Sequence, residues 1–120
     1  KVVPQDSLFD AVRQHDVGVF GIKPFASNSL FRGDSSLDGP HAEEDNRLAR
    51  LAIRYVLANP AITAPIPGLI SIEQVDTVAK AVMERRDLDQ QETADLHRAT
   101  RAMWARLPGN YQWLKEWEHV

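Results

Sequence analysis

The fold of this 120-residue chain is decided by the stretch Val17-Gly18-Val19-Phe20-Gly21-Ile22-Lys23-Pro24. Its first six residues are all apolar or glycine, a pattern typical of a strand buried on both faces in a parallel sheet. The strand is expected to end at Lys23-Pro24, because proline has no N–H to donate to a neighbouring strand. A second run, Ala61-Ile62-Thr63-Ala64-Pro65-Ile66, predicts another short strand leading into Pro67-Gly68, although Pro65 inside it weakens the pattern.

Two helices are predicted beside these strands. A short one is expected over residues 7–15, with Leu8, Ala11 and Val12 on one face. A longer one is expected over residues 41–58. Its apolar stripe consists of Leu48, Leu51, Ala52, Tyr55 and Val56. Between the first strand and this helix, residues 26–40 are mostly Ser, Asn, Asp and Gly, which predicts a long functional or disordered loop anchored by Leu30 and Phe31.

Two further helices are predicted from capping boxes, in which two side chains satisfy each other's backbone N–H groups. Ser71-Ile72-Glu73-Gln74 predicts a helix from Ile72 to about Arg86. Its expected buried face consists of Val75, Val78, Ala79 and Val82. Asp89-Gln90-Gln91-Glu92 predicts another helix. Its residues at helical spacing are Leu96, Ala99, Met103 and Trp104, and an aromatic tail over residues 111–117 is expected to pack against the rest of the chain.

The order helix, strand, helix, strand, helix, helix leaves connections long enough for parallel strands. Both strands have sequences typical of burial on both faces, and the helices are too many for a sheet of two strands. The sheet is therefore expected to have further strands that this chain does not supply. The sequence therefore predicts an α/β fold, as a piece of a larger barrel or doubly wound sheet.

Composition excludes several classes of protein. Hydrophobic residues make up 43% and charged residues 26% of the chain, as in ordinary globular proteins. Fourteen basic and 17 acidic residues are interspersed, for a net charge of −3, so no basic face for nucleic acid is visible. The absence of cysteine excludes disulfides and cysteine-ligated metals and fits the reducing cytoplasm. No apolar run approaches the roughly 20 residues of a membrane span, so no membrane partner is expected.

The N-terminal sequence Lys1-Val2-Val3-Pro4 is not a signal peptide and lacks an initiator methionine, so the chain is expected to be processed or truncated.

Two segments at the predicted strand ends are candidate ligand loops, residues 22–30 and 66–71. In the second, Pro67 and Gly68 let the backbone approach a ligand closely, and the following helix start can take an anion on its free N–H groups. The alternative is a tight strand-to-helix turn that binds nothing.

A series of motifs here resembles the seventh and eighth strand–helix units of aldo-keto reductases. In chain order the matching segments are residues 18–26 (GVFGIKPFA), 57–60 (LANP), 66–68 (IPG) and 71–75 (SIEQV). The resemblance covers roughly residues 8–82. It implies a (β/α)8 TIM barrel, with residues 1–88 as its C-terminal part and residues 89–120 as a C-terminal helical extension.

The resemblance further implies that an extended NAD(P)H is bound without a Gly-rich turn. Residues 23–30 would line the pyrophosphate and nicotinamide, and residues 66–74 the adenosine end. The implied cofactor contacts are Ile22, Lys23, Pro24, Phe25, Ala26, Asn28, Ser29, Leu30, Pro67, Gly68, Leu69, Ile70, Ser71 and Gln74.

This sequence departs from the family pattern at four of the compared positions. Ile22 stands where many members stack a Tyr under the nicotinamide, which weakens stacking. Gly68 and Gln74 stand where a Lys and an Arg often grip the adenosine 2′-phosphate, and Val78 where an Asn is usual. The choice between NADP and NAD therefore stays open, with only helix-terminal N–H groups and Ser71 left for that phosphate.

No catalytic residue is assigned in this chain, because the family's Asp, Tyr, Lys and His belong to the first half of the barrel. The implied activity is hydride transfer to a small aldehyde or ketone when the barrel is complete, and the chain alone is expected to be inactive. Tyr55 is expected in the core rather than as a proton donor. Lys23 could form a Schiff base if burial lowered its pKa, but no partner acid or base is identified.

The remaining candidates favour structural roles. His15, His41, His97 and His119 have no ligand spacing, so no metal site is predicted, and His41 with Glu43 and Glu44 fits a solvated helix start. Trp104, Trp113 and Trp117 could cover a substrate pocket, with plain packing as the alternative.

Two other hypotheses compete with the reductase. One is a non-catalytic partial-barrel module that binds a nucleotide or a protein through open strand edges. The other is a remnant without function. Under the leading hypothesis the partner is the remainder of the barrel, in the same protein or a second chain. Unpaired backbone groups of such a piece cost about 1–3 kcal/mol each when buried, so it should associate or unfold.

Overall fold

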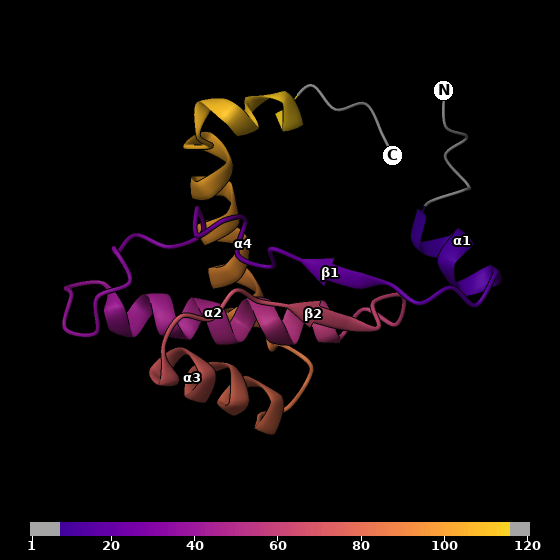
Figure 1. Ribbon diagram of the computed structural model, residues 1–120, viewed down its shortest axis with the longest axis horizontal. Coiled ribbons are helices and arrows are strands. Elements are labelled where there is room, and N and C mark those ends of the chain that lie inside the picture. Colours follow the sequence, from indigo (N-terminus) through magenta and orange to yellow (C-terminus); the bar gives the residue numbers. More distant parts are fainter. Residues whose placement is uncertain (1–7, 116–120) are drawn as a thin grey trace.

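A computed structural model describes residues 8–115, which form a mixed α/β fold. Its elements are α1 (Leu8–Gln14), β1 (Phe20–Ile22), α2 (Ala42–Leu57), β2 (Ala64–Ile66), α3 (Ile72–Met83), α4 (Gln90–Ala105) and the 3-10 helix η1 (Gly109–Lys115). The predicted order of helices and strands is confirmed. Within these residues the four α-helices accompany a two-stranded sheet that does not close into a barrel (Figure 1).

The two strands are parallel, as predicted, and the sheet is short. Phe20 pairs with Ala64, Gly21 with Pro65 and Ile22 with Ile66. Towards the start of β1, Thr63 Oγ1 accepts a hydrogen bond of 2.8 Å from the Val19 N–H. Both strands span three residues rather than the six expected for each, and Pro65 in β2 has no N–H to extend the ladder.

Burial of β1 on both faces was a wrong expectation. Phe20 is 67% exposed and Ile22 is 70% exposed, because they point to the same side of the strand and nothing in residues 8–115 covers that side. Gly21 points to the other side, towards Ile62. The apolar sequence of β1 therefore leaves a hydrophobic surface uncovered.

Helix α2 is the centre of the molecule, with β2, α3 and α4 packed around it (Figure 1). Ile53, in the C-terminal half of α2, is completely buried. The buried core combines α2 with residues from the loop after β1 and from α3 and α4. Its members are Phe25, Leu30, Leu48, Ala49, Leu51, Ala52, Ile53, Ala81 and Leu96. The predicted anchors Leu30 and Phe31 both contact this core, and the predicted extension contributes Leu96 to it.

The expectation that Tyr55 lies in the core was wrong, since it is 56% exposed. The buried surface of α2 is wider than one stripe and includes Ala49, Ile53 and Arg54, because three elements pack on the helix. Tyr55 lies outside the arc that they cover.

The predicted buried face of α3 was wrong except for Val78. Val75 is 50% exposed and Val82 is 62% exposed, whereas Ala81 is buried and Val78 packs against the core. Helix α3 packs mainly on α2, so only a narrow stripe can be covered. The helix ends at Met83 instead of about Arg86, because Glu84 takes an extended conformation.

The two predicted capping boxes differ. At α4 the box is complete: Asp89 accepts from the Glu92 N–H, and the Glu92 side chain accepts from the Asp89 N–H. At α3, Ser71 Oγ accepts from the Gln74 N–H at 3.3 Å, but the Gln74 side chain accepts from Ile70 rather than from Ser71. The predicted reciprocal pair at α3 is therefore replaced by a bond one residue earlier.

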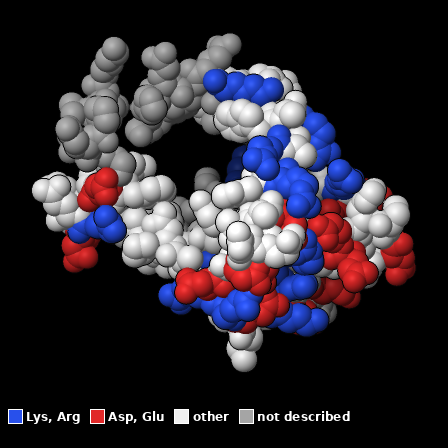
Figure 2. Space-filling view, turned by 180° about the vertical axis from the view of Figure 1, so that it is seen from behind, with Lys and Arg blue, Asp and Glu red and all other residues white. Residues whose placement is uncertain are grey.

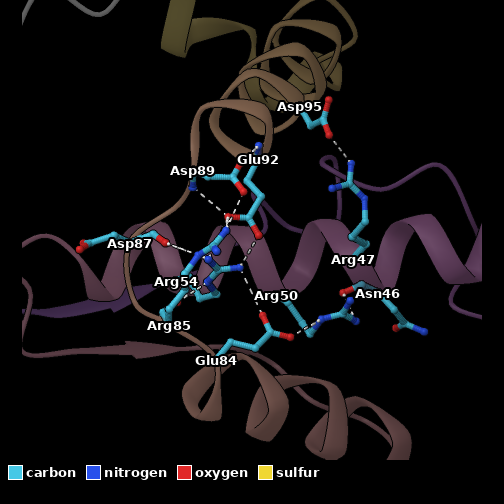
Figure 3. A network of polar contacts seen from close by, with 10 residues as sticks. All are labelled: Asn46, Arg47, Arg50, Arg54, Glu84, Arg85, Asp87, Asp89, Glu92 and Asp95. Carbon is cyan, nitrogen blue, oxygen red and sulfur yellow. Dashed lines mark hydrogen bonds and ion pairs between the residues drawn. The ribbon is translucent and has the colours of Figure 1, made fainter.

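An ionic network fastens α4 and the α3–α4 linker to α2 (Figure 3). Arg54 of α2 is 2% exposed and faces Glu84 and Glu92. Nearer the N-terminus of α2, Arg47 forms an ion pair of 2.7 Å with Asp95 of α4. These ion pairs link α4 and the α3–α4 linker to two positions along α2.

Charged residues are unevenly distributed over the surface. From the side opposite to Figure 1, basic and acidic residues intermingle over the helical part of the molecule, while other parts of this face are largely uncharged (Figure 2). Helix α1 stands at one end, away from α2, α3 and α4 (Figure 1). No helix within residues 8–115 is long and apolar enough to cross a membrane.

Candidate functional site

A groove lies between the loop after β1, the start of α2 and the start of α3. Its lining consists of some of the residues in the ranges 25–41, 42–49 and 68–78. Its volume is about 380 Å³. That volume is at the lower end of the roughly 300–1,000 Å³ typical of ligand sites. The three segments are distant in sequence and meet only in the folded chain.

The first wall of the groove comes from a tight turn after β1. Phe25 is buried beneath it and Asn28 lines the groove. Ala26, Ser27 and Asn28 have φ values of 50°, 53° and 66°, in the left-handed region that non-glycine residues seldom adopt. The turn brings the chain back over the core, where Phe25 and Phe31 rings lie 5.1 Å apart.

Asp45 of α2 fixes the next part of the loop. Its carboxylate accepts hydrogen bonds from the Arg32 N–H at 3.0 Å and from the Gly33 N–H at 2.7 Å. A Cβ on Gly33 would lie only 2.8 Å from Asp45 Oδ2, so any larger residue at this position would require the carboxylate to shift. The long loop is thereby held against the N-terminal turn of α2.

The third wall is formed by the turn after β2 and the start of α3. Gly68, Leu69 and Ile70 line the groove together with Gln74. A Cβ added at Gly68 would meet nothing within 4 Å, so the backbone there is open to a ligand. The Ile72 and Glu73 N–H groups donate to no acceptor in residues 8–115, which leaves them available to an anion.

The charged groups that line the groove are of both signs. Two of the three carboxylates are already hydrogen-bonded: Asp45 as described, and Asp34 to the Ser36 N–H at 3.0 Å. Hydrogen bonds from the Ser36 hydroxyl and backbone lower the pKa of Asp34. Glu73 has no such donor, and Arg32 forms no ion pair with an acid of residues 8–115.

The structure brings together part of the predicted cofactor site. The predicted residues that line the groove are Phe25, Asn28, Gly68, Leu69, Ile70 and Gln74. Those outside its lining are Ile22, Lys23, Pro24, Ala26, Ser29, Leu30, Pro67 and Ser71. Of these, Leu30 is a buried core residue, Ile22 faces outward from β1, and Ser71 caps α3.

Residues 32–46 contribute to the groove but were not among the predicted ligand residues. Arg32, Gly33 and Asp45 shape the groove, yet none belongs to a recognised motif. The available signal was the polar composition of residues 26–40, which indicated a functional or disordered loop. Nothing in the local sequence indicated that Asp45 would bind that loop.

Of the other candidates, His41 lines the groove, whereas Lys23, Trp104 and Trp113 do not. Lys23 Nζ donates to the Tyr111 hydroxyl at 3.3 Å. Trp104 is 45% exposed and Trp113 is 50% exposed, and neither lines the groove, while Trp117 and His119 lie outside the described residues. Among residues 8–115, no group of three or more His, Asp or Glu side chains could hold a metal ion.

Comparisons of the chain with protein-family models, with curated proteins and with solved structures gave no match.

Proposed function

We propose that this chain is the nucleotide-binding, C-terminal part of an NAD(P)H-dependent aldo-keto reductase. The catalytic groups would lie on the missing part of a (β/α)8 barrel, where hydride passes from the cofactor to a small aldehyde or ketone. The observation that carries the proposal is the convergence of the two strand-end loops, residues 23–30 and 67–74, on one groove. Ligands of parallel α/β folds bind at this end of the strands.

The chemistry of the groove suits part of a dinucleotide. Apolar side chains such as Leu69 and Ile70 offer a surface for a ring, and the free N–H groups at the start of α3 can meet a phosphate. Arg32, from the long loop, supplies a cation to the groove. Gly68 and Gln74 stand where members of the aldo-keto reductase family often have a Lys and an Arg, and they supply none. The Arg32 cation favours an anionic end of the cofactor in the groove.

Calorimetric titration with NADP⁺ and NAD⁺ tests the proposal. We expect both to bind, and Arg32→Gln to weaken NADP⁺ binding by about tenfold, as one lost charge-assisted hydrogen bond would. The same change should weaken NAD⁺ binding less, because NAD⁺ lacks the 2′-phosphate. Glu73→Gln should strengthen binding of both by removing a like charge.

A matched pair of glycine variants locates the ligand. Gly68→Leu places a side chain in the groove, whereas Gly109→Leu places it at the start of η1, and both sites have open space around the Cβ. We expect only the first to abolish binding. Absence of NADP⁺ and NAD⁺ binding to the unaltered chain, or equal binding by the two variants, would reject the proposal.

The assignment of catalysis to a missing segment has its own test. The pure chain should not oxidise NADPH in the presence of a panel of aldehydes. Steady oxidation would show that residues of this chain suffice for turnover.

A second candidate function is association through the open sheet. Phe20, Ile22 and Ile66 expose apolar surface, and each of the two strands has an unpaired edge within residues 8–115. Native mass spectrometry distinguishes the possibilities. A second polypeptide that completes the barrel supports the reductase, while a defined homo-oligomer that binds no nucleotide supports a binding module.

A further inference from the structure

The hydroxyl of Tyr111 joins the end of the described chain to the turn after β1. It lies 2.9 Å from Ser27 Oγ and accepts a hydrogen bond of 3.3 Å from Lys23 Nζ, which also lies 5.8 Å from the centre of the Tyr111 ring. Tyr111 belongs to η1, more than 80 residues further along the chain. Hydrogen bonds from Ser27 and Lys23 lower the pKa of Tyr111.

The turn that Tyr111 contacts has an unfavourable backbone. Lys23 has a φ of 54°, and the three left-handed residues 26–28 follow it. None of the four is glycine, so surrounding contacts must hold this conformation. Within the turn, the Ala26 N–H donates to the Lys23 carbonyl at 2.9 Å, and the amides that follow donate to carbonyls of the turn: Ser29 to Ala26 at 3.1 Å, Leu30 to Phe25 at 3.4 Å and Phe31 to Asn28 at 3.0 Å.

The same turn forms one wall of the groove. Phe25 and Asn28 both line it, and they flank Ser27 within three residues. A displacement of Lys23 or Ser27 would therefore move the wall, although Tyr111 itself is not part of the lining. Loss of the two hydrogen bonds of the Tyr111 hydroxyl would therefore alter the groove without changing any residue that lines it.

We propose that Tyr111 is a positioning residue, whose hydroxyl holds residues 23–28 in the conformation that places Phe25 and Asn28 on the groove wall. Helix η1 thereby belongs to the functional unit instead of being a passive end of the chain. The effect on a ligand rests on the function proposed above, but the effect on the turn does not.

Hydrogen exchange tests the effect on the turn. Tyr111→Phe removes the hydroxyl and keeps the ring, and Tyr55→Phe is the matched control, since the Tyr55 hydroxyl has no partner in residues 8–115. We expect Tyr111→Phe to speed exchange of the Ser29, Leu30 and Phe31 amides by about tenfold, as one or two lost hydrogen bonds would. Amides of α2 should not change in either variant. Unchanged exchange in the turn would overturn the proposal.

A mutant cycle separates positioning from a general loss of stability. Tyr111→Phe should have a much smaller effect on these amides when Ser27→Ala and Lys23→Met are already present, because the partners are gone. An equal effect in both backgrounds would mean that the hydroxyl does not act through the turn.

Nucleotide affinity completes the test. If the unaltered chain binds NADP⁺, Tyr111→Phe should raise the dissociation constant by about five- to tenfold, with Tyr55→Phe unchanged. Equal affinity in Tyr111→Phe and the unaltered chain would overturn the positioning role. If the unaltered chain binds no nucleotide, the proposed function fails, and the exchange data alone decide whether Tyr111 holds the turn.

Discussion

Arg54 of α2 and Glu92 of α4 face each other through two hydrogen bonds, 2.9 Å between Nη1 and Oε1 and 3.0 Å between Nη2 and Oε2 (Figure 3). The same guanidinium donates to the carbonyl oxygens of Arg85 at 2.6 Å and Asp87 at 2.9 Å. One buried side chain thus holds the α3–α4 linker and the first turn of α4. The planar fork of arginine is suited to this set of acceptors.

The stability of the chain should depend on the ionisation of Glu92. The hydrogen bond from Arg54 is the main cause that lowers the pKa of Glu92 from 4.5 to about 2. Folding favours the ionised form, so this stabilisation is complete above pH 4.5 and is lost as the pH falls towards 2. We expect urea unfolding to show a loss on the order of 2–3 kcal/mol from this group over that interval.

Glu92→Gln should remove most of that pH dependence, because the amide does not titrate. Glu73→Gln, at an exposed residue of α3, is the control and should keep the slope of the parent. A parent-like slope in Glu92→Gln would contradict the assignment.

Replacing Arg54 should be severe. Arg54→Met removes two of the hydrogen bonds to Glu92, which keeps those from the Arg85 side chain and the Asp89 N–H, and it removes the Arg54 donor from the Arg85 and Asp87 carbonyls. The loss of one partner of a buried ion pair typically costs about 3–5 kcal/mol. The free energy of unfolding from urea denaturation measures this. Arg101→Met, at an exposed residue on α4, should change it by less than about 0.5 kcal/mol. Similar values for the two variants would show that the network contributes little.

Gly33→Ala should disturb the loop that borders the groove. The new Cβ would lie 2.8 Å from Asp45 Oδ2, so the carboxylate must move and its bonds to the Arg32 and Gly33 N–H groups weaken. We expect a loss on the order of 1–2 kcal/mol in unfolding free energy and faster exchange of these two amides. Gly109→Ala, where a Cβ has open space, is the control. Slow exchange in Gly33→Ala would contradict the tight approach seen here.

Ile53→Ala should test whether α2 is the centre of the core. Ile53 is completely buried, and truncation of such a side chain costs about 2–5 kcal/mol. Val82→Ala on the exposed side of α3 should leave stability within about 0.5 kcal/mol. Thermal and urea unfolding of both variants measure the difference, and equal losses would exclude a core organised by α2.

The local sequence was sufficient to predict the four α-helices and the two strands, but not the 3-10 helix η1. Periodic apolar residues, the capping residues Ser71 and Asp89, and the proline and glycine at the strand ends act over a few neighbouring residues, so their effects are visible without the fold. The parallel pairing also followed, because the connection between the strands is too long for a hairpin and contains a helix.

Burial of particular faces could not be predicted in the same way. The pattern of β1 fits a strand covered on both sides, and that of α3 fits a broad apolar face, yet Ile22 and Val75 are exposed. The sequence pattern of a helix or strand shows which of its faces is apolar. Which face is buried depends on the other elements that pack against it. Here α3 packs mainly on α2, and one side of the sheet has no covering element within residues 8–115.

The sequence by itself determined the order and type of the four α-helices and two strands, the N-cap residues Ser71 and Asp89, and the two proline-containing strand ends. Only the tertiary structure decided that Asp45 holds Arg32 and Gly33, that Arg54 holds the α4 start, and that Tyr111 reaches Lys23 and Ser27. These contacts join residues 12 to 88 positions apart, and polar side chains carry no periodic signal of their partners. Such pairs become specific only when packing of the apolar core has set the distances between them.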